Sequence, residues 1–390
     1  MDNNQHINPL IFKGQGETYL GIWIVNIFLS IVTLGIYSAW AKVRTKRYFY
    51  GSTELAGDVF EYHGTPGQIL KGRLVALVCV LVWALVSQTS GPISAIMLLG
   101  FYLALPWLLW SNARFDSAMT SYRNVHFSFE GSLALAYKHI LGRGIGALVL
   151  MALYIVVITV TAQVSIVLSV ILGLGALIVM ALLYSWVVSG MMRYFVNGYR
   201  YGDWAFSADI KQGVFSKIYF SAMAYGILGF IALSIVTIAS SFSGGRITDM
   251  LQGQMPSFGI DQVMPFVMMY IGFILITLAL TAYTASRVRN YLFSCMLLTH
   301  SETSQLKLTF ISQFNTRGYM WLILSNFLLQ VVSLGFARPW VMVRSARYVA
   351  DNTRVVGDMS LLVSYDQPSN VDSAISDELA QAFDLNLGIG

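Results

Sequence analysis

Long stretches without a charged side chain restrict this chain more than any other feature. Residues 74–113 and 144–192 contain no Asp, Glu, Lys or Arg, and residues 218–286 carry charges only in a central segment, 241–262. A helix crosses the hydrocarbon of a bilayer in about 20 residues, so each stretch is long enough for two spans joined by a turn. The sequence therefore predicts three central helical hairpins that each cross a membrane twice.

The composition excludes several other classes of protein. Of the 390 residues, 56% are hydrophobic and 11% are charged, whereas about 25% of an ordinary soluble domain is charged. Such low polarity excludes intrinsic disorder, and the absence of charged heptads excludes a coiled coil. The two cysteines cannot form a disulfide framework and the five histidines are scattered, so no metal or other cofactor is expected. The first residues lack a basic segment followed by an apolar core, so no cleaved signal peptide is expected.

Basic residues gather in five segments beside the apolar stretches. Of the 24 Lys and Arg residues, 22 lie in segments 42–73, 114–143, 193–217, 287–317 and 338–358. Because cytoplasmic loops of membrane proteins are rich in Lys and Arg, these segments are expected in the cytoplasm and the loop 241–262 outside. The pattern predicts a multi-pass protein with both termini in the cytoplasm. It also explains the formal charge of +5 by membrane topology rather than by nucleic-acid binding.

The two ends of the chain are copies of one unit. Residues 19–58 align with residues 319–358 without a gap, and 14 of the 40 positions are identical, against roughly three expected by chance at this composition. An aromatic residue four positions before an arginine recurs in other basic segments, as at Trp110/Arg114 and Tyr283/Arg287. The chain is therefore built from repeats.

Each repeat also contains a short alternating segment. Gly-Asp pairs at Gly57-Asp58, Gly202-Asp203 and Gly357-Asp358, and Arg123-Asn124, precede polar–apolar alternation. A turn dipeptide followed by period-2 alternation predicts a short strand, here near Phe60, Phe127, Phe206, Leu308 and Val363. The expected fold class is an α-helical polytopic membrane protein of repeated helical hairpins, with short cytoplasmic β elements after each hairpin that pair with one another.

The terminal copies leave two alternatives open. Residues 19–50 and 319–350 are long enough for one span each, which would place the two copies in opposite orientations. A re-entrant hairpin that turns at Thr33–Gly35 and Ser333–Gly335 would keep both copies alike and all basic residues inside. The domain organisation expected is then a cytoplasmic segment 1–18, a repeated membrane domain 19–365 and an acidic C-terminal tail 366–390. Its central hairpins are 74–113, 144–192 and 218–286.

Specific motifs carry a family resemblance. The run TLGIYSAWAKVRTKRYFYGST, with FKGQGETYLGIWIVN before it and FEYHGTPGQILKGR after it, is similar to the YjgN-like family of bacterial inner-membrane proteins. The similarity covers essentially the whole chain. It implies a multi-span protein of the bacterial inner membrane and implies no activity, because the family is one of unknown function. The C-terminal copy departs from the first, with Arg338-Pro339 in place of Ser38-Ala39.

Two sets of polar residues are candidates for a site. Five arginines stand where helices leave the membrane: Arg44, Arg114, Arg193, Arg287 and Arg344. They either anchor the helices at lipid phosphates or line a vestibule that binds an anion or a lipid headgroup, with Asp58 and Asp358 as partners. The equivalent Asn26 and Asn326, within the apolar part of the terminal units, either hydrogen-bond across helices or contact a substrate.

The leading functional hypothesis is a non-enzymatic inner-membrane protein that forms a pore, carrier or lipid-binding vestibule open to the cytoplasm. No set of acid, base or metal-binding residues suggests an enzyme. The alternative is a structural or regulatory protein that recruits a partner through its β elements and acidic tail, where Val371, Ile375, Leu379 and Phe383 suggest an amphipathic helix. Membrane lipids are the expected partners. The substrate, the energy coupling and the oligomeric state are not encoded in any visible motif.

Overall fold

The computed structural model describes residues 6–89, 91–243, 260–301 and 306–362. The expected outside loop lies largely beyond the described residues, and the acidic tail lies wholly beyond them. Within the described part, six helices are long and apolar enough to cross a membrane. At most 17% of the most apolar window of each is buried inside the protein, so these surfaces need an apolar environment around them.

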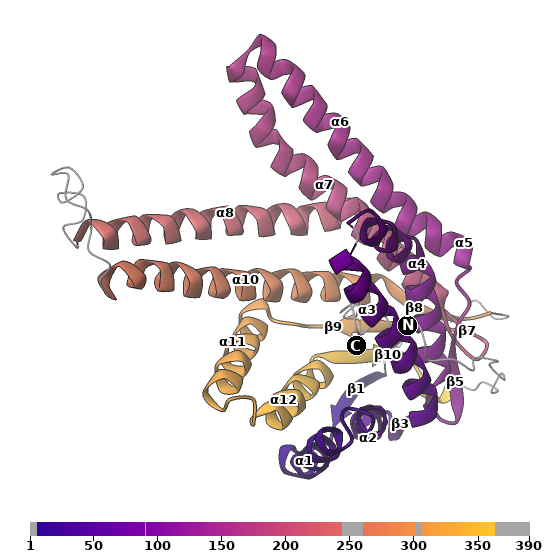
Figure 1. The fold of residues 1–390 in the computed structure, drawn as a ribbon. Helices are drawn as coiled ribbons and strands as arrows, with labels where there is room; N and C mark the ends of the chain where they lie inside the picture. The colour runs from indigo at the N-terminus through magenta and orange to yellow at the C-terminus, as the bar shows by residue number, and fades with distance from the viewer. Residues whose placement is uncertain (1–5, 90, 244–259, 302–305, 363–390) are drawn as a thin grey trace.

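The six long helices form three pairs (Figure 1). These are α3 (Pro66–Thr89) with α4 (Gly91–Ala118), α6 (Arg143–Val164) with α7 (Ile166–Gly198), and α8 (Gln212–Ser243) with α10 (Ile260–Cys295). A short helix, α5 (Leu133–Ala136), and a π-helical turn, Tyr137–Gly142, lead into α6. The break between α6 and α7 falls at Ser165, whose extended backbone starts the new helix and whose hydroxyl accepts a hydrogen bond from the Leu168 amide.

The two end copies fold into matching short hairpins. They are α1 (Gly16–Val32) with α2 (Ser38–Gly51), and α11 (Thr316–Val332) with α12 (Arg338–Asp351). Leu34 and Leu334 both have φ of 50°, and the glycines after them have φ of 91° and 89°, so the two turns share one backbone conformation. A left-handed residue followed by glycine ends a helix abruptly, which explains why the chain reverses at these positions instead of continuing as one span.

Short strands between the helix pairs close into a barrel. Ten strands are found in the described residues, each paired antiparallel with its neighbours, in the order β1-β10-β9-β8-β7-β6-β5-β4-β3-β2. The bounds are β1 Ile7–Phe12, β2 Thr53–Leu55, β3 Asp58–Tyr62, β4 Thr120–Tyr122, β5 Val125–Phe129, β6 Tyr199–Tyr201, β7 Trp204–Ala208, β8 Met296–His300, β9 Lys307–Ser312 and β10 Thr353–Val356. Strands therefore form at four of the five predicted places, as β3, β5, β7 and β9. The predicted pairing of these segments with one another is wrong, because a second strand that directly follows each long helix or terminal hairpin lies between them in the barrel. In the part of the chain that the structure describes, closure therefore leaves no edge of this sheet unpaired.

The fifth predicted strand does not form in the described residues. After Gly357-Asp358 the chain forms a 3-10 turn, Met359–Leu361, and Val363 lies outside the described residues. The partner of β10 is instead β1 at the other end of the chain, with Ile7 opposite Val356. Because β1 also pairs with β2, placing Leu10 opposite Leu55, it joins the first and last repeats and closes the ring.

The strand pairing reveals five equivalent repeats with side chains in layers. Alternate residues of a strand face the same side of a sheet. The inward-facing residues at equivalent positions of the five repeats therefore form layers inside the barrel. The entrance layer, next to the helix ends, is Thr53, Thr120, Tyr199, Met296 and Thr353. The middle layer is Leu10, Phe60, Phe127, Phe206 and Phe310, each opposite a member of the turn-end layer, Leu55, Tyr122, Tyr201, Leu298 and Val355.

The barrel is closed at the end where the strands turn. Tyr122 donates to the Leu55 carbonyl at 2.7 Å, and Tyr201 donates to the Tyr122 carbonyl at 2.9 Å, so hydroxyls of one repeat bind the backbone of the repeat before it. Trp204, Met359 and the remaining turn-end side chains are buried in the same cluster. This end therefore serves as the hydrophobic core of the barrel rather than as an opening.

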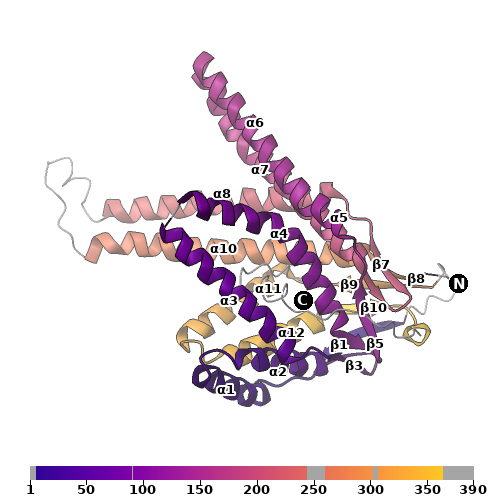
Figure 2. The same ribbon diagram turned by 45° about the vertical axis from the view of Figure 1, so that its right-hand side comes forward.

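The helix pairs surround the other end of the barrel and spread from it. In each pair the second helix (α2, α4, α7, α10 or α12) continues within one or two residues into a strand. Figures 1 and 2 show the three long pairs leaving the barrel in different directions, so that they separate with distance from it. The helices consequently contact neighbouring pairs mainly near the barrel.

Candidate ligand-binding chamber

The strand register divides the five helix-end arginines into two sets. Three of them lie nine residues before the entrance-layer residue of their own repeat: Arg44 before Thr53, Arg287 before Met296 and Arg344 before Thr353. Arg114 and Arg193 lie only six residues before Thr120 and Tyr199. The aromatic–arginine spacing therefore equates Arg114 with Arg44, Arg287 and Arg344, although Arg114 lies about one helical turn closer to its strand.

The position six residues before the entrance layer is a structural anchor. Its side chain donates to the backbone carbonyl of the loop that follows the adjacent strand. Arg47 donates to Gly64 at 3.4 Å, Arg347 to Gly14 at 3.1 Å, Asn290 to Phe314 at 3.0 Å and Arg193 to Ile210. In the second repeat, Trp110 donates to Gly131 at 2.7 Å, and Arg114 lies 4.8 Å from the centroid of that indole ring. These contacts tie each second helix to the start of the next hairpin.

The other three arginines interact locally. Arg44 donates to the Tyr37 hydroxyl at 3.2 Å and to Asn26 Oδ1 at 3.4 Å, both within its own hairpin. Arg344 donates to Ser325 Oγ at 3.1 Å, and Arg287 lies over the Tyr283 ring. In the described part of the chain, the hydrogen bonds and ring contacts of these arginines join none of the five to another, and none of the five lines the hollows described below.

The expected acidic partners lie elsewhere. Asp58 accepts from Arg123 Nε at 2.5 Å, and Asp358 accepts from the Ser360 amide at 2.9 Å. Both aspartates are at the turn end of the barrel, opposite the end reached by the helices, and so they do not partner Arg44 or Arg344.

The two buried asparagines join the helices of their own hairpins. Asn26 donates to the Ala41 carbonyl at 3.4 Å, and Asn326 donates to Ser345 Oγ at 3.1 Å. They are 5% and 6% exposed, so a substrate in the surroundings would reach little of either side chain. Each contact is a hydrogen bond between the two helices of one hairpin.

A chamber lies where the barrel opens toward the helices. It consists of three adjoining hollows, which share Phe60 of the middle layer as a common wall. The first, about 390 Å³, is inside the barrel. The second, about 370 Å³, reaches the ends of α2, α4 and α7 at Tyr50, Ser117 and Val196. The third, about 700 Å³, extends between α2 and α12 along Val341, Ser345 and Val349. We refer to this space as the chamber.

In every repeat, the same face of the second helix lines the chamber. The residues three positions before the entrance layer all line it: Tyr50, Ser117, Val196, Phe293 and Ala350. The same face includes the position seven before the layer, occupied by Lys46, Ala113, Met192, Arg289 and Ala346. Two residues rotate about 200° around a helix, so Arg289 lies on the face of α10 opposite Arg287. Arg289 does not follow the aromatic–arginine spacing, since Ala285 lies four residues before it, and so the sequence pattern does not point to it.

Arg289 brings a positive charge to the chamber. Its guanidinium lies 4.5 Å from the Phe293 ring centroid and 4.8 Å from that of Phe314, and Nη2 donates to Thr353 Oγ1 at 3.2 Å. Its Nε is buried and has no hydrogen-bond partner in the described structure. Among the described residues no carboxylate lies within ion-pair distance of it.

The other charged group in the wall is paired. Asp116 lies 2.5 Å from Lys46 Nζ, and Lys46 also lies over the Tyr62 ring at 4.8 Å. The barrel tyrosines contribute no charge: burial raises the pKa of Tyr122, Tyr199 and Tyr201, so these phenols stay protonated at neutral pH. Among the described residues, Arg289 is therefore the charged group of the chamber wall that has no ion-pair partner.

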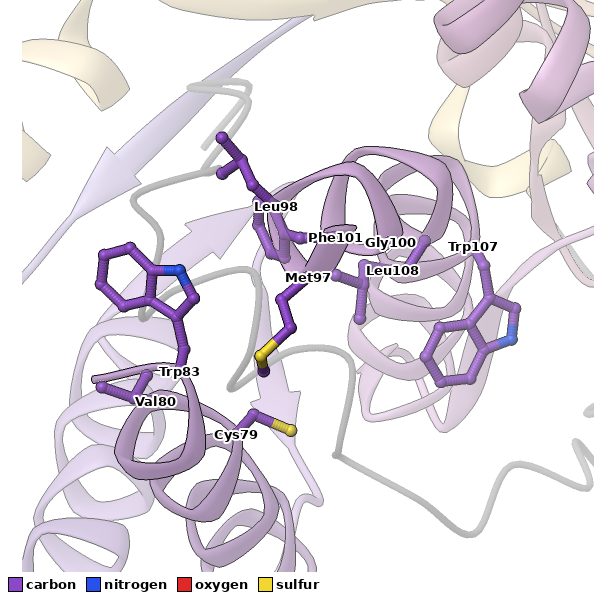
Figure 3. Close-up of a pocket in the computed structure, with 10 residues that line it drawn as sticks. Cys79, Val80, Trp83, Met97, Leu98, Gly100, Phe101, Trp107 and Leu108 are labelled. Carbon is purple, nitrogen blue, oxygen red and sulfur yellow. The ribbon is translucent and has the colours of Figure 1, made fainter. Parts of the chain in front are cut away.

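A separate hollow lies between α3 and α4. It has a volume of about 420 Å³ and is lined by apolar residues with two tryptophans and one cysteine. Figure 3 shows Met97 of α4 reaching toward Cys79 of α3, with Trp83 and Trp107 at the two sides. No charged group lines it, so this hollow offers mainly dispersion contacts.

One polar cluster on the barrel contains the residue types of a hydrolase active site, but a substrate has no access to it. His63 Nε2 lies 2.7 Å from Ser121 Oγ and 3.5 Å from Glu61. Ser121, however, is fully buried, so a substrate could not reach its hydroxyl. The cluster instead joins β3 to β4. Among the described residues, no group of three His, Cys, Asp or Glu side chains is placed to hold a metal ion.

Comparison with known proteins gives consistent matches. Residues 8–382 match the family described as "Bacterial protein of unknown function (DUF898)". The chain is 27% identical to the inner membrane protein YjgN of Salmonella typhimurium over 380 residues, which cover 93% of this chain and 91% of that protein. It is 34% identical to YjgN of Escherichia coli O157:H7 over 134 residues, about a third of each chain. No solved structure matches the chain.

Proposed function

The chain belongs to the DUF898 family and is related to inner membrane proteins named YjgN, and from this membership and the chamber we propose that it binds a membrane amphiphile. The protein is multi-pass, and the proposed site is the barrel entrance, where the ligand is bound without a reaction being catalysed. The observation that carries the proposal is a chamber of mostly apolar walls between a closed barrel and helices that separate outward. An amphiphile matches such a site because its apolar part fills the space between helices and its polar part meets the barrel.

The closed turn end of the barrel favours a binding site over an aqueous pore. A pore along the axis would have to pass the buried side chains of Tyr122, Tyr201 and Trp204. The third hollow instead continues sideways between α2 and α12, toward the apolar surfaces of the helices. Entry from the bilayer through this side therefore requires no change in the barrel core. Among the vestibule, carrier and pore hypotheses, this arrangement supports a vestibule or carrier that a lipid enters laterally.

The tips of the terminal hairpins support insertion of these hairpins into the bilayer as re-entrant elements. Leu34 is 94% exposed and Leu334 is 88% exposed, which is unfavourable in water. The turn satisfies its own backbone: the Gly35 amide donates to the Ser30 carbonyl at 2.7 Å, and the Tyr37 amide donates to Thr33 Oγ1 at 2.9 Å. Backbone that is not helical needs such hydrogen bonds within the protein when it lies at membrane depth.

Filling the chamber should displace its ligand. Ala346 faces the third hollow, and replacing it with tryptophan would occupy the space between α12 and α2. We expect Ala346→Trp to lower the amount of lipid that co-purifies with the protein by about tenfold, the equivalent of ~1.4 kcal/mol of binding free energy. Native mass spectrometry of protein extracted in mild detergent measures the bound lipid directly.

The matched control places the same side chain on an exposed surface. Val332→Trp, at a position 84% exposed at the end of α11, should leave the bound lipid unchanged. Both variants should retain the melting behaviour of the parent protein. The proposal fails if the parent protein carries no specifically bound lipid, or if Ala346→Trp retains as much as Val332→Trp.

The proposed orientation places the barrel and both termini in the cytoplasm. A cysteine introduced at Ser257, in the loop 241–262, should react with a membrane-impermeant maleimide in intact cells, whereas cysteines at Ser52 or Ser369 should not. The experiment is done in a background without Cys79 and Cys295, which are both free thiols. Labelling of Ser52→Cys from outside would reverse the assigned orientation.

A further inference from the structure

We propose that the chamber selects amphiphiles with an acidic headgroup, a phosphodiester or carboxylate, and that Arg289 binds this headgroup. The inference rests on the proposed function, since it names the chemical class of the ligand of the same chamber. Arg289 is half-buried, its Nε is fully buried, and the groups in contact with its guanidinium are neutral.

The contacts that Arg289 makes do not compensate its charge. Two aromatic rings and one threonine hydroxyl partner a group with five N–H donors, and Nε remains without a partner. Aromatic faces attract a cation, but each such contact stabilises it far less than burial of the charge destabilises it. A partly buried cation of this kind is stabilised when an anion enters the same space.

The shape of the group favours a headgroup with two oxygens. A guanidinium presents paired N–H groups in one plane, which match a phosphate or carboxylate with two hydrogen bonds. At the equivalent positions of the other repeats, Ala113, Met192 and Ala346 carry no charge and Lys46 is paired with Asp116. The chamber is thus asymmetric, and its anion-binding end lies at the fourth repeat.

The location of Arg289 relative to the apolar walls indicates a lipid rather than a free anion. Arg289 contacts Thr353 of the entrance layer, where the helices end and the barrel begins. Most of the remaining wall is apolar, including Val341, Met342 and Val349 of α12. A headgroup at Arg289 would therefore leave room for acyl chains between α2 and α12, whereas a free inorganic anion would leave these walls unfilled.

The test compares the lipid selectivity of three proteins in nanodiscs made of equal amounts of phosphatidylglycerol and phosphatidylethanolamine. We expect the parent protein to retain phosphatidylglycerol about tenfold over phosphatidylethanolamine after extraction, as measured by native mass spectrometry. Arg289→Gln should lose this preference while still carrying lipid. Arg287→Gln, two residues away on the opposite face of the same helix, should keep it.

The outcomes separate this inference from the proposed function. Unchanged preference for phosphatidylglycerol in Arg289→Gln would overturn the role of Arg289 while leaving lipid binding intact. Absence of bound lipid in the parent protein would overturn the proposed function itself. If Arg289→Gln does not fold, Arg289→Lys replaces it: the charge is kept but the planar pair of donors is lost, so a partial loss of preference is expected, and an unchanged preference would overturn the inference.

A further arm distinguishes the source of the anion. Inorganic phosphate and a short-chain phosphatidylglycerol are each added to delipidated protein, and the melting temperature is recorded. The inference expects stabilisation by the lipid well beyond that by phosphate, and loss of this difference in Arg289→Gln. Equal stabilisation by phosphate alone would show a free-anion site and overturn the assignment to a lipid.

Discussion

Replacing Trp204 with alanine is expected to destabilise the protein by about 3–5 kcal/mol, the usual loss when a buried tryptophan is truncated. Trp204 is 1% exposed at the turn end of the barrel, and its ring lies edge-on to His300 at 5.2 Å between centroids. Its removal would leave a cavity in the layer that closes the barrel. We expect the temperature at which half of the detergent-solubilised protein stays monodisperse to fall on the order of 10 °C.

The control for this variant is another tryptophan in a different environment. Trp321 of α11 is 66% exposed, and Trp321→Ala removes the same atoms without opening an internal cavity. It should shift the transition by no more than a few degrees. An equal effect of the two substitutions would mean that the barrel is not the stabilising core of the protein.

Placing a carboxylate at the tip of the first hairpin is expected to prevent stable membrane integration. On scales of insertion into the bilayer, an aspartate at the centre of a span costs about 2.5–3.5 kcal/mol. Leu34→Asp puts this charge on a side chain that projects from the hairpin tip, and Leu334→Asp does the same in the equivalent copy. We expect each to reduce the membrane-integrated, monodisperse fraction of a fluorescent fusion severalfold, and the double variant to reduce it further.

Two controls separate the charge from the change of backbone. Leu34→Gly removes the side chain at a residue whose φ of 50° suits glycine, so it should integrate normally. Val59→Asp introduces the same charge on an exposed residue of β3 and should have little effect. If Leu34→Asp behaves like Val59→Asp, the hairpin tip is in water and the re-entrant assignment is wrong.

The local elements were predictable because each depends on a short pattern. Apolar length predicts the helices, and a Gly-Asp turn before alternating residues predicts strands such as Asp58–Tyr62 and Trp204–Ala208. The same reasoning failed at Met359–Leu361, where β1 from the opposite end of the chain already occupies the edge of β10. A pairing between residues 7 and 356 leaves no local signature in the sequence.

The candidate site was predicted only in part for a similar reason. The spacing of aromatic and basic residues finds arginines at helix ends, but it does not tell which face of each helix is turned toward the axis. Arg287, which the spacing includes, lies over the Tyr283 ring, whereas Arg289, which the spacing does not include, faces the chamber. These two residues of α10 are two positions apart and lie on opposite faces of the helix, and only the register of the following strand tells which face is turned toward the axis.

The sequence by itself determined that this chain is a membrane protein made of repeats, because hydrophobic length, basic flanks and the 300-residue offset between its end copies are all properties of the chain read in order. Only the tertiary structure decided that the β elements form a closed barrel, that β1 joins the two ends, and that Arg289 brings to the barrel entrance a charge with no ion-pair partner among the described residues. The physical reason is that ring closure and burial are set by pairings between distant residues, and the free energy of each pairing depends on all the repeats being present together.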